Sequence, residues 1–492
     1  MKNVAKPKKY RATEDSGASM YVAHEKIHAR EISGRFQTLR KLAVFVLLGL
    51  YYFLPWLNWN GRQAVLFDLP ERQFHVFGLT FWPQDFFFLA LLLIIAALSL
   101  FFFTALAGRL WCGYACPQTV WTEVFVWMER LAEGKRNQRV RLDAGPWNRE
   151  KILRKTAKHG MWVLFALWTG FTFVGYFTPI ETLGLRLLDF NLGPWEAFWI
   201  FFYGFATWGN AGFLREQVCM YMCPYARFQS AMFDSNTLII AYDTERGEPR
   251  GLRRKAVPDV ATREKLFASI KVEHNAPAEA KLDFPPPEAL GDCVDCNLCV
   301  QVCPVGIDIR DGLQYECIAC AACIDACDSV MDKMGYPRGL IRYDTQNGME
   351  KKPSRILRPR TLIYGALLLA LMGAWIAGVT LRQPVAMDVL RDRNALYRVV
   401  NDNVENVYTL KIMNKGNAGQ RYRLSVEGID AELVVEREAA TRPGEVLSLP
   451  VRIQAGLGTV AGGGHDIAFV LETEDGARIV EKSRFFAPGE MQ

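Results

Sequence analysis

Residues 293–327 read CVDCNLCVQVCPVGIDIRDGLQYECIACAACIDAC, and the rest of the chain is organised around this stretch. It holds eight of the twelve cysteines of a 492-residue chain. The first half has the spacing C-x2-C-x2-C-x3-C-P, with Pro304 closing a run made by Cys293, Cys296, Cys299 and Cys303. The second half repeats the spacing with Asp328 in place of the proline, at Cys317, Cys320, Cys323 and Cys327.

Three thiolates two residues apart on a tight loop can face one iron–sulfur cube, and the fourth points at the other cluster in two-cluster ferredoxins. The spacing therefore predicts two [4Fe–4S] clusters in an α+β ferredoxin-like insert. We expect the cluster 1 ligands to be Cys293, Cys296, Cys299 and Cys327. We expect the cluster 2 ligands to be Cys317, Cys320, Cys323 and Cys303. A pair of zinc sites is the alternative, but zinc prefers C-x2-C pairs with longer spacers.

The other four cysteines form two C-x3-C-P elements, GRLWCGYACPQTVW at 108–121 and REQVCMYMCPYARFQ at 215–229. Proline disfavours the α region in the residue before it and favours the first position of a helix. Cys116 and Cys223 should therefore stand at helix N-caps, where the helix dipole lowers a thiol pKa, aided by Arg109, Arg215 and Arg227. We expect a catalytic metal or redox site made by Cys112, Cys116, Cys219 and Cys223, holding copper, a third cluster or redox dithiols. The alternative is small apolar fillers at a bilayer edge.

Half of the residues are hydrophobic and 12% are aromatic, and both values are high for a soluble enzyme. Five apolar runs are long enough to cross a bilayer: 42–57, 86–107, 161–178, 195–213 and 361–381. The residues before the first run are polar and basic, with no small-residue cleavage site after it, so a retained anchor is expected. The fold class is thus a multi-domain membrane protein with five transmembrane α-helices.

Lysine and arginine counts indicate the orientation of these runs. Segment 1–41 has ten and loop 109–160 has eleven, whereas loops 59–84 and 179–194 have two and one. The positive-inside rule then places the N-terminus and the cysteines in the cytoplasm of a multi-pass inner-membrane protein. The basic residues are explained by the lipid bilayer, and no binding motif for nucleic acid accompanies them. No ionisable residue lies deep in the five runs, which disfavours a transporter.

The final part of the chain changes character. Short alternating strands, as around Tyr408, Leu410 and Ile412, predict a C-terminal all-β immunoglobulin-like sandwich outside the membrane. It contains no cysteine, and His465 stands alone in it, so partner binding is favoured over chemistry. The expected domains are a cytoplasmic segment (1–41), four spans with both C-x3-C-P elements (42–233), a linker (234–288), the ferredoxin-like domain (289–350), the fifth span (361–381) and the periplasmic sandwich (383–492).

One further motif, HEKIH at 24–28, matches the zinc-protease pattern H-E-x-x-H. It lies in a polar basic segment without a clear third ligand, so a protease is disfavoured. Weak metal binding by His24 and His28 is one hypothesis, and a solvated amphipathic helix is the other.

With its five spans, paired C-x3-C-P elements, double cluster motif and terminal sandwich, the chain resembles the CcoG/FixG/RdxA family of bacterial cytochrome c oxidase accessory proteins. Its front part is also similar to NapH-type membrane ferredoxins. The resemblance implies a cupric reductase that converts Cu(II) to Cu(I) for assembly of a cbb-type oxidase, with oxidase subunits, copper chaperones or copper transporters as partners. A quinol-linked electron conduit and a non-enzymatic assembly scaffold are the alternatives, and the electron donor is unknown. Asp328 departs from the cluster motif, which affects a local turn rather than the ligands.

Overall fold

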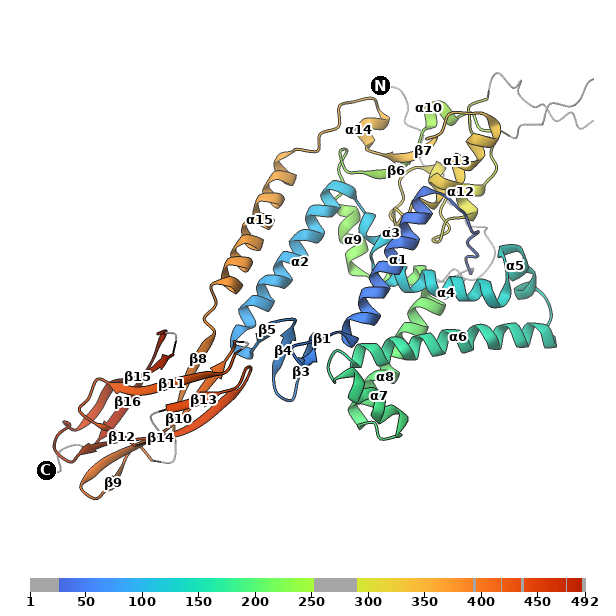
Figure 1. Ribbon diagram of the computed structural model, residues 1–492. Helices are drawn as coiled ribbons and strands as arrows, with labels where there is room; N and C mark the ends of the chain where they lie inside the picture. Colours follow the sequence, from blue (N-terminus) through green and yellow to red (C-terminus); the bar gives the residue numbers. More distant parts are fainter. Residues whose placement is uncertain are drawn as a thin grey trace, which may run out of the picture.

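The computed structural model describes residues 26–251, 290–392, 395–416, 418–434, 438–474 and 476–488. Figure 1 shows an elongated molecule, in which the elements that carry the eight clustered cysteines lie at one end of two long helices. A β-sandwich lies at the other end of the same helices, and a second group of helices packs to one side.

Three helices of the described chain are long and apolar enough to cross a membrane. They are α1 (Arg35–Phe53), which continues into the short helix η1 (Leu54–Trp56), α2 (Phe86–Ala107) and α15 (Pro359–Thr380). Two of them, α2 and α15, pack along each other. Trp375 Nε1 donates a hydrogen bond of 3.2 Å to the carbonyl of Phe88, and a Cβ at Gly378 would meet the Phe88 ring at 2.9 Å.

The other two predicted spans are not confirmed. Helix α6 (Arg149–Val174) is polar over its first half, and helix α8 (Pro194–Thr207) has only 14 residues before it passes into the π-helix η3 (Trp208–Leu214). A crossing takes about 20 apolar residues, which neither helix supplies. The two pack closely, because Gly170 lets the α8 backbone approach: a Cβ there would lie 2.2 Å from the carbonyl oxygen of Ile200.

Figure 1 shows that α6 and α4 (Pro117–Glu133) run across the direction of α2 and α15. The remaining helices of this region are α3 (Leu110–Tyr114), α5 (Arg136–Ala144), α7 (Ile180–Leu188), the π-helix η4 (Val218–Met222) and α9 (Pro224–Ala231). Beside α1, the chain forms β1 (Asn58–Trp59), β2 (Arg62–Gln63), β3 (Val65–Asp68), β4 (Gln73–Val76), β5 (Leu79–Phe81) and η2 (Pro83–Asp85).

The cysteine-rich domain begins earlier in the chain than the sequence analysis placed it. Strand β6 (Ile239–Tyr242) falls in the range assigned to the linker, yet it pairs antiparallel with β7 (Ile341–Asp344). Between them lie α10 (Thr244–Gly247), α12 (Leu298–Gln301), η6 (Ile309–Asp311) and α13 (Ala322–Met334), with α14 (Gln346–Met349) after them. The proline-rich part of the linker, 284–287, lies outside the described residues.

Asp325 of α13 joins this domain to the first long helix. Its carboxylate accepts hydrogen bonds from the backbone N–H groups of Phe36 (3.2 Å) and Gln37 (2.7 Å) in the first turn of α1. Gly34 makes the approach possible, because a Cβ at this position would lie 2.3 Å from the Asp325 carboxyl carbon. Asp325 thus acts as an N-cap for α1, although it lies 289 residues away from Phe36 in the sequence.

The C-terminal part is a sandwich of two antiparallel sheets. One has the order β12-β14-β10-β8, with β9 also paired to β10, and the other has the order β13-β11-β15-β16. The strands are β8 (Val385–Arg391), β9 (Arg398–Val400), β10 (Asn403–Asn414), β11 (Gln420–Glu427), β12 (Glu432–Val434), β13 (Glu438–Thr441), β14 (Val446–Gly456), β15 (Gly463–Thr473) and β16 (Arg478–Ala487).

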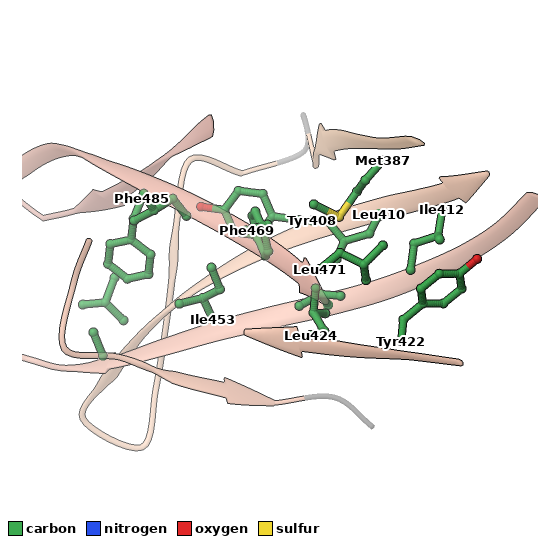
Figure 2. Close-up of a cluster of buried hydrophobic side chains, with 14 of the residues drawn as sticks. Met387, Tyr408, Leu410, Ile412, Tyr422, Leu424, Ile453, Phe469, Leu471 and Phe485 are labelled. Carbon is green, nitrogen blue, oxygen red and sulfur yellow. The ribbon is translucent and has the colours of Figure 1, made fainter. Parts of the chain in front are cut away.

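The predicted alternation of the sandwich is confirmed. Figure 2 shows Tyr408, Leu410 and Ile412 of one sheet facing Phe469 and Leu471 of the other, and all five are fully buried. His465 makes a local contact with the backbone, because its Nε2 lies 2.6 Å from the carbonyl oxygen of Ala461.

A buried ion pair attaches the sandwich to the start of α2. The carboxylate of Asp85 lies 2.9 Å from Lys415 Nζ and 3.4 Å from an Nη of Arg382, and the side chains of Asp85 and Lys415 are almost fully buried. The same carboxylate accepts the backbone N–H of Trp82 at 3.1 Å. One side chain therefore holds the entrance of a membrane helix and the sandwich together.

Replacing Asp85 by Asn should loosen this attachment without unfolding the sandwich. Removing one member of a buried pair leaves two uncompensated cations, at a cost of about 3 kcal/mol. We expect faster amide hydrogen exchange in η2 and at the start of β8, with unchanged protection around Tyr408. Asp466→Asn is the control, since it removes an exposed pair with Arg484 and should change neither region. Equal behaviour of both variants would contradict the attachment.

Candidate functional site

The structure brings together the four thiols predicted for cluster 1. They line one cavity with the apolar side chains of Val330, Met331 and Leu340, and they are Cys293, Cys296, Cys299 and Cys327. Cys327 comes from α13, in the second half of the motif, as the two-cluster pattern requires.

A second cavity is lined by the four thiols predicted for cluster 2, which are Cys303, Cys317, Cys320 and Cys323. Cys299 also reaches its wall, so the two cavities are neighbours. Helix α13 carries Cys323, which faces the second cavity, and Cys327, which faces the first.

The two loops share an unusual backbone conformation. In each loop the residues on either side of the middle cysteine have positive φ, with 49° at Asp295, 54° at Asn297, 53° at Ala319 and 59° at Ala321. A non-glycine residue in this region costs roughly 1–2 kcal/mol. The matched conformations curl each loop around its cavity, which shows that the sequence repeat is also a structural repeat.

The number of thiols around each cavity fits an iron–sulfur cluster. Each cavity is lined by the four cysteines predicted to hold one [4Fe–4S] cluster. Burial raises the pKa of Cys299 to about 11, against the opposing charge of Arg310. Burial, followed by the neighbouring thiols of Cys299 and Cys293, raises the pKa of Cys327 to about 12. Burial also raises the pKa of Cys303 to about 12. The positive charge of an iron–sulfur core would offset the cost of burying these thiolates and the repulsion between them.

The two C-x3-C-P elements come together in a second candidate site, which we call the four-thiol site. Helices α4 and α9 begin at Pro117 and Pro224, so the predicted N-cap positions of Cys116 and Cys223 are confirmed. Cys112 Sγ lies 3.2 Å from Gln229 Oε1 of α9. The other three thiols all act electrostatically on Cys112.

The prediction of a lowered pKa at the helix N-cap is wrong for Cys116. Burial, reinforced by the neighbouring thiols, raises the pKa of Cys112 to about 12 and that of Cys219 to about 11. Burial also raises the pKa of Cys116. The charge of Arg109 acts in the opposite direction on Cys112 and Cys219 but does not outweigh desolvation. Binding of a metal at Cys112, Cys116 or Cys219 would therefore displace a thiol proton.

Helix α3 places the four-thiol site directly against the cluster 2 loop. A Cβ at Gly113 would lie 2.8 Å from the carbonyl oxygen of Ile318 and 2.9 Å from Cys320 Cα. Arg40 Nε donates 3.2 Å to the Gly113 carbonyl. Buried Arg109 donates to the carbonyls of Tyr315, beside the cluster 2 cysteines, and Ala226, in α9. No signal in the sequence indicates this contact between segments 200 residues apart.

The sequence analysis also missed a group of buried charges on α4. Glu129 is fully buried and lies 2.8 Å from Arg215 and 3.2 Å from Arg139. Burial alone would raise its pKa, but Arg215 and Lys26 outweigh burial and lower it. Glu133, equally buried, pairs with Lys158 at 2.8 Å. These pairs tie α4 to α5, α6, the end of η3 and the segment before α1.

The described part of the chain contains no group of three metal-ligating side chains at the H-E-x-x-H motif. His28 Nε2 lies 3.2 Å from the Asp143 carboxylate, and burial followed by the charge of Lys26 lowers its pKa. His24 lies outside the described residues.

Three family profiles match the chain. Residues 214–346 match a profile described as a 4Fe-4S dicluster domain, and residues 89–136 match one described as a 4Fe-4S binding domain. Residues 375–488 match a profile described as an IG-like fold at the C-terminal of FixG. The second match includes Cys112 and Cys116. Together with the fold, these matches define the class: a membrane-associated iron–sulfur protein of the oxidoreductase type.

Relatives extend over most of the chain. It is 38% identical to the nitrogen fixation protein FixG of Rhizobium meliloti over 470 residues, covering 88% of this chain and 85% of that one. It is 40% identical to protein RdxB (90% and 92% covered) and protein RdxA (83% and 84%) of Cereibacter sphaeroides. The chain therefore belongs to the FixG/RdxA family. A solved FixG-related protein from Vibrio parahaemolyticus is 35% identical and covers 22% of this chain and all of its own, with a TM-score of 0.21.

The crossed arrangement of the cluster ligands can be tested by pairs of variants. Cys327→Ser should remove the same cluster signal as Cys293→Ser, and Cys303→Ser the same signal as Cys317→Ser. Low-temperature EPR with iron analysis separates the two sets, because the two clusters differ in their surroundings. If Cys303→Ser and Cys293→Ser removed the same signal, each half of the motif would bind its own cluster and the crossed arrangement would be wrong.

Replacing Gly113 by Ala should strain the contact between α3 and the cluster 2 loop, because its Cβ would meet backbone atoms that cannot rotate away. Overpacking of this kind costs about 1–3 kcal/mol, so the thermal unfolding temperature should fall. Gly160→Ala is the matched control: Gly160 lies inside α6 with no atom within 4 Å of its Cβ position, and alanine there should stabilise by about 0.5–1 kcal/mol. If both substitutions raised, or both lowered, the thermal unfolding temperature, the close contact at Gly113 would be contradicted.

Proposed function

We propose that this protein is a cupric reductase of the bacterial inner membrane, which supplies Cu(I) for cytochrome c oxidase assembly. One observation carries the proposal: the helix that holds Cys112 lies against the loop that holds Cys320, within van der Waals distance of its backbone. Electrons delivered to the ferredoxin-like domain therefore reach a second group of four thiols without crossing solvent.

The bound [4Fe–4S] clusters would supply single electrons. The chain's own contribution is the four-thiol site, where cysteine thiols exchange their protons for a soft metal ion. Thiolates favour Cu(I) over Cu(II), so the same ligands that bind the ion favour its reduction. Each copper ion takes up one electron. Whether these four thiols hold copper itself or a third cluster is part of what the experiment below decides.

The proposed placement is supported by the lysine and arginine counts of the loops, which are highest before the first long helix and in loop 109–160. The N-terminal segment, the clusters and the four-thiol site face the cytoplasm, and the immunoglobulin-like domain faces the periplasm. The described part of the sandwich carries an apolar core and no thiol, which supports partner binding. Oxidase subunits, copper chaperones or copper transporters are the proposed partners.

Two serine variants test the shared four-thiol site. Because the repeat makes Cys116 and Cys223 equivalent N-caps, Cys116→Ser and Cys223→Ser should each abolish cupric reduction to the same extent. Iron content should stay at eight per chain in both variants, as measured with EPR and metal analysis. If one variant kept wild-type cupric reduction and the other lost it, the shared-site hypothesis would be wrong. Loss of iron from wild-type levels above eight would instead indicate a third cluster.

A further inference from the structure

The two C-x3-C-P elements are equivalent in sequence but not in surroundings. Cys112 packs against an apolar group that includes Val302, Val305 and Cys320 of the ferredoxin-like domain. Cys219 instead lines a cavity of about 100 Å³, whose wall also includes Val302 and Val305. Cys112 is not among the residues that line this cavity, so the four-thiol site reaches it through Cys219.

This cavity lies between the segment before α1, the start of α1, helix α4 and the cluster 2 loop. Ile27 and Ile32 come from the first of these, Gln37 from α1, Val126 from α4 and Ile318 from the loop. The covering segment is held by backbone groups: Arg30 N–H donates 2.7 Å to the Gln301 carbonyl. Such a volume accommodates several water molecules or a small chelate.

Positive charge predominates in the lining of the cavity. Five arginines line it, Arg30, Arg40, Arg130, Arg139 and Arg215, against three carboxylates, Glu31, Glu123 and Glu216. Glu129 lies behind Arg139 and Arg215 and compensates part of the excess. A hydrated Cu²⁺ ion is repelled by such a lining, whereas a complex with negative charge is attracted.

Of the arginines that line the cavity, Arg130 is the one most readily available to bind an incoming molecule. Its Nη1 pairs with Glu31 at 3.0 Å, and Glu31 is half exposed at the rim. The other partner, Glu123, is 4.0 Å from Arg130 and is engaged more closely by Arg40 at 3.2 Å. A carboxylate of an incoming molecule can therefore replace that of Glu31 without leaving a buried charge unpaired.

We propose that this cavity is the substrate entrance of the four-thiol site, and that it receives copper as a small anionic, carboxylate-bearing chelate. The inference rests on the proposed function. A copper–oxygen bond of the chelate breaks as a copper–sulfur bond to Cys219 forms, and the thiol proton passes to the released carboxylate. One electron then enters from the Cys112 side and converts Cu(II) to Cu(I).

The test uses full-length protein in detergent with its clusters reduced and excess reductant removed. Stopped-flow absorbance follows cluster reoxidation by Cu(II)–citrate, which is anionic, and by Cu(II)–bis-glycinate, which is neutral. We expect citrate to be the better substrate. Arg130→Gln should raise the half-saturating citrate-complex concentration about fivefold, and Glu31→Gln, which frees Arg130, should lower it. Both shifts should be smaller with bis-glycinate.

Arg154→Gln is the control, since it removes an exposed charge pair on α6 and should change neither substrate. A readout without copper is protection of Cys219: citrate alone should slow its alkylation by iodoacetamide, measured by peptide mass spectrometry, more in wild type than in Arg130→Gln. The proposed entrance would be wrong if both chelates reoxidised the clusters equally well, if the Arg130 and Glu31 variants behaved like wild type, and if citrate did not protect Cys219 from alkylation. Failure of every copper complex to reoxidise the clusters would instead overturn the proposed function.

Discussion

The carboxylate of Asp325 at the start of α1 is the contact on which the geometry of this protein depends. It lies on α13 between Cys323 and Cys327, so a single helix carries a thiol of each cavity and the cap of a membrane helix. An acidic group at a helix N-terminus satisfies free N–H groups and favours the helix dipole by about 1 kcal/mol. That modest energy has a large structural effect, because it fixes the position of the cysteine-rich domain relative to α1.

A second consequence of this anchoring is the close contact at Gly113. Once α13 is fixed on α1, the cluster 2 loop is brought against α3, and Arg40 of α1 reaches the Gly113 carbonyl from the other side. Three segments distant in sequence thus meet around one backbone position. The two groups of thiols are joined by direct packing at Gly113, rather than through a flexible connection between domains.

Much of this arrangement follows from sequence patterns that act locally. Cysteine spacing predicts which thiols share a cavity, proline positions predict where α4 and α9 begin, and period-two alternation predicts the core around Tyr408. Patterns of this kind fail where distant segments decide the outcome. Three of the five predicted spans are helices long and apolar enough to cross a membrane. The other two fall on α6 and α8, which pack on each other and keep apolar side chains such as Leu164, Trp168 and Phe205 exposed. The thiol pKa values also depended on burial, which the helix-dipole argument did not include.

The buried acids of α4 illustrate the same limit. Glu129 and Glu133 look like ordinary surface positions of an amphipathic helix, and only the folded chain shows that basic side chains from four other segments surround them. The cavity beside Cys219 has the same origin, since its lining comes from α1, α4, α5 and the ferredoxin-like domain together. Sites assembled from so many segments leave no spacing pattern in the sequence.

The pairing of β6 with β7 has a consequence for the order of synthesis. Ile239 is opposite Asp344, so the ferredoxin-like domain cannot close until the ribosome has passed residue 344. By then α1, α2 and both C-x3-C-P elements have been made. The closed ferredoxin-like domain therefore forms after the first two long helices, and the carboxylate of Asp325 can cap α1 only after α1 itself has been synthesised.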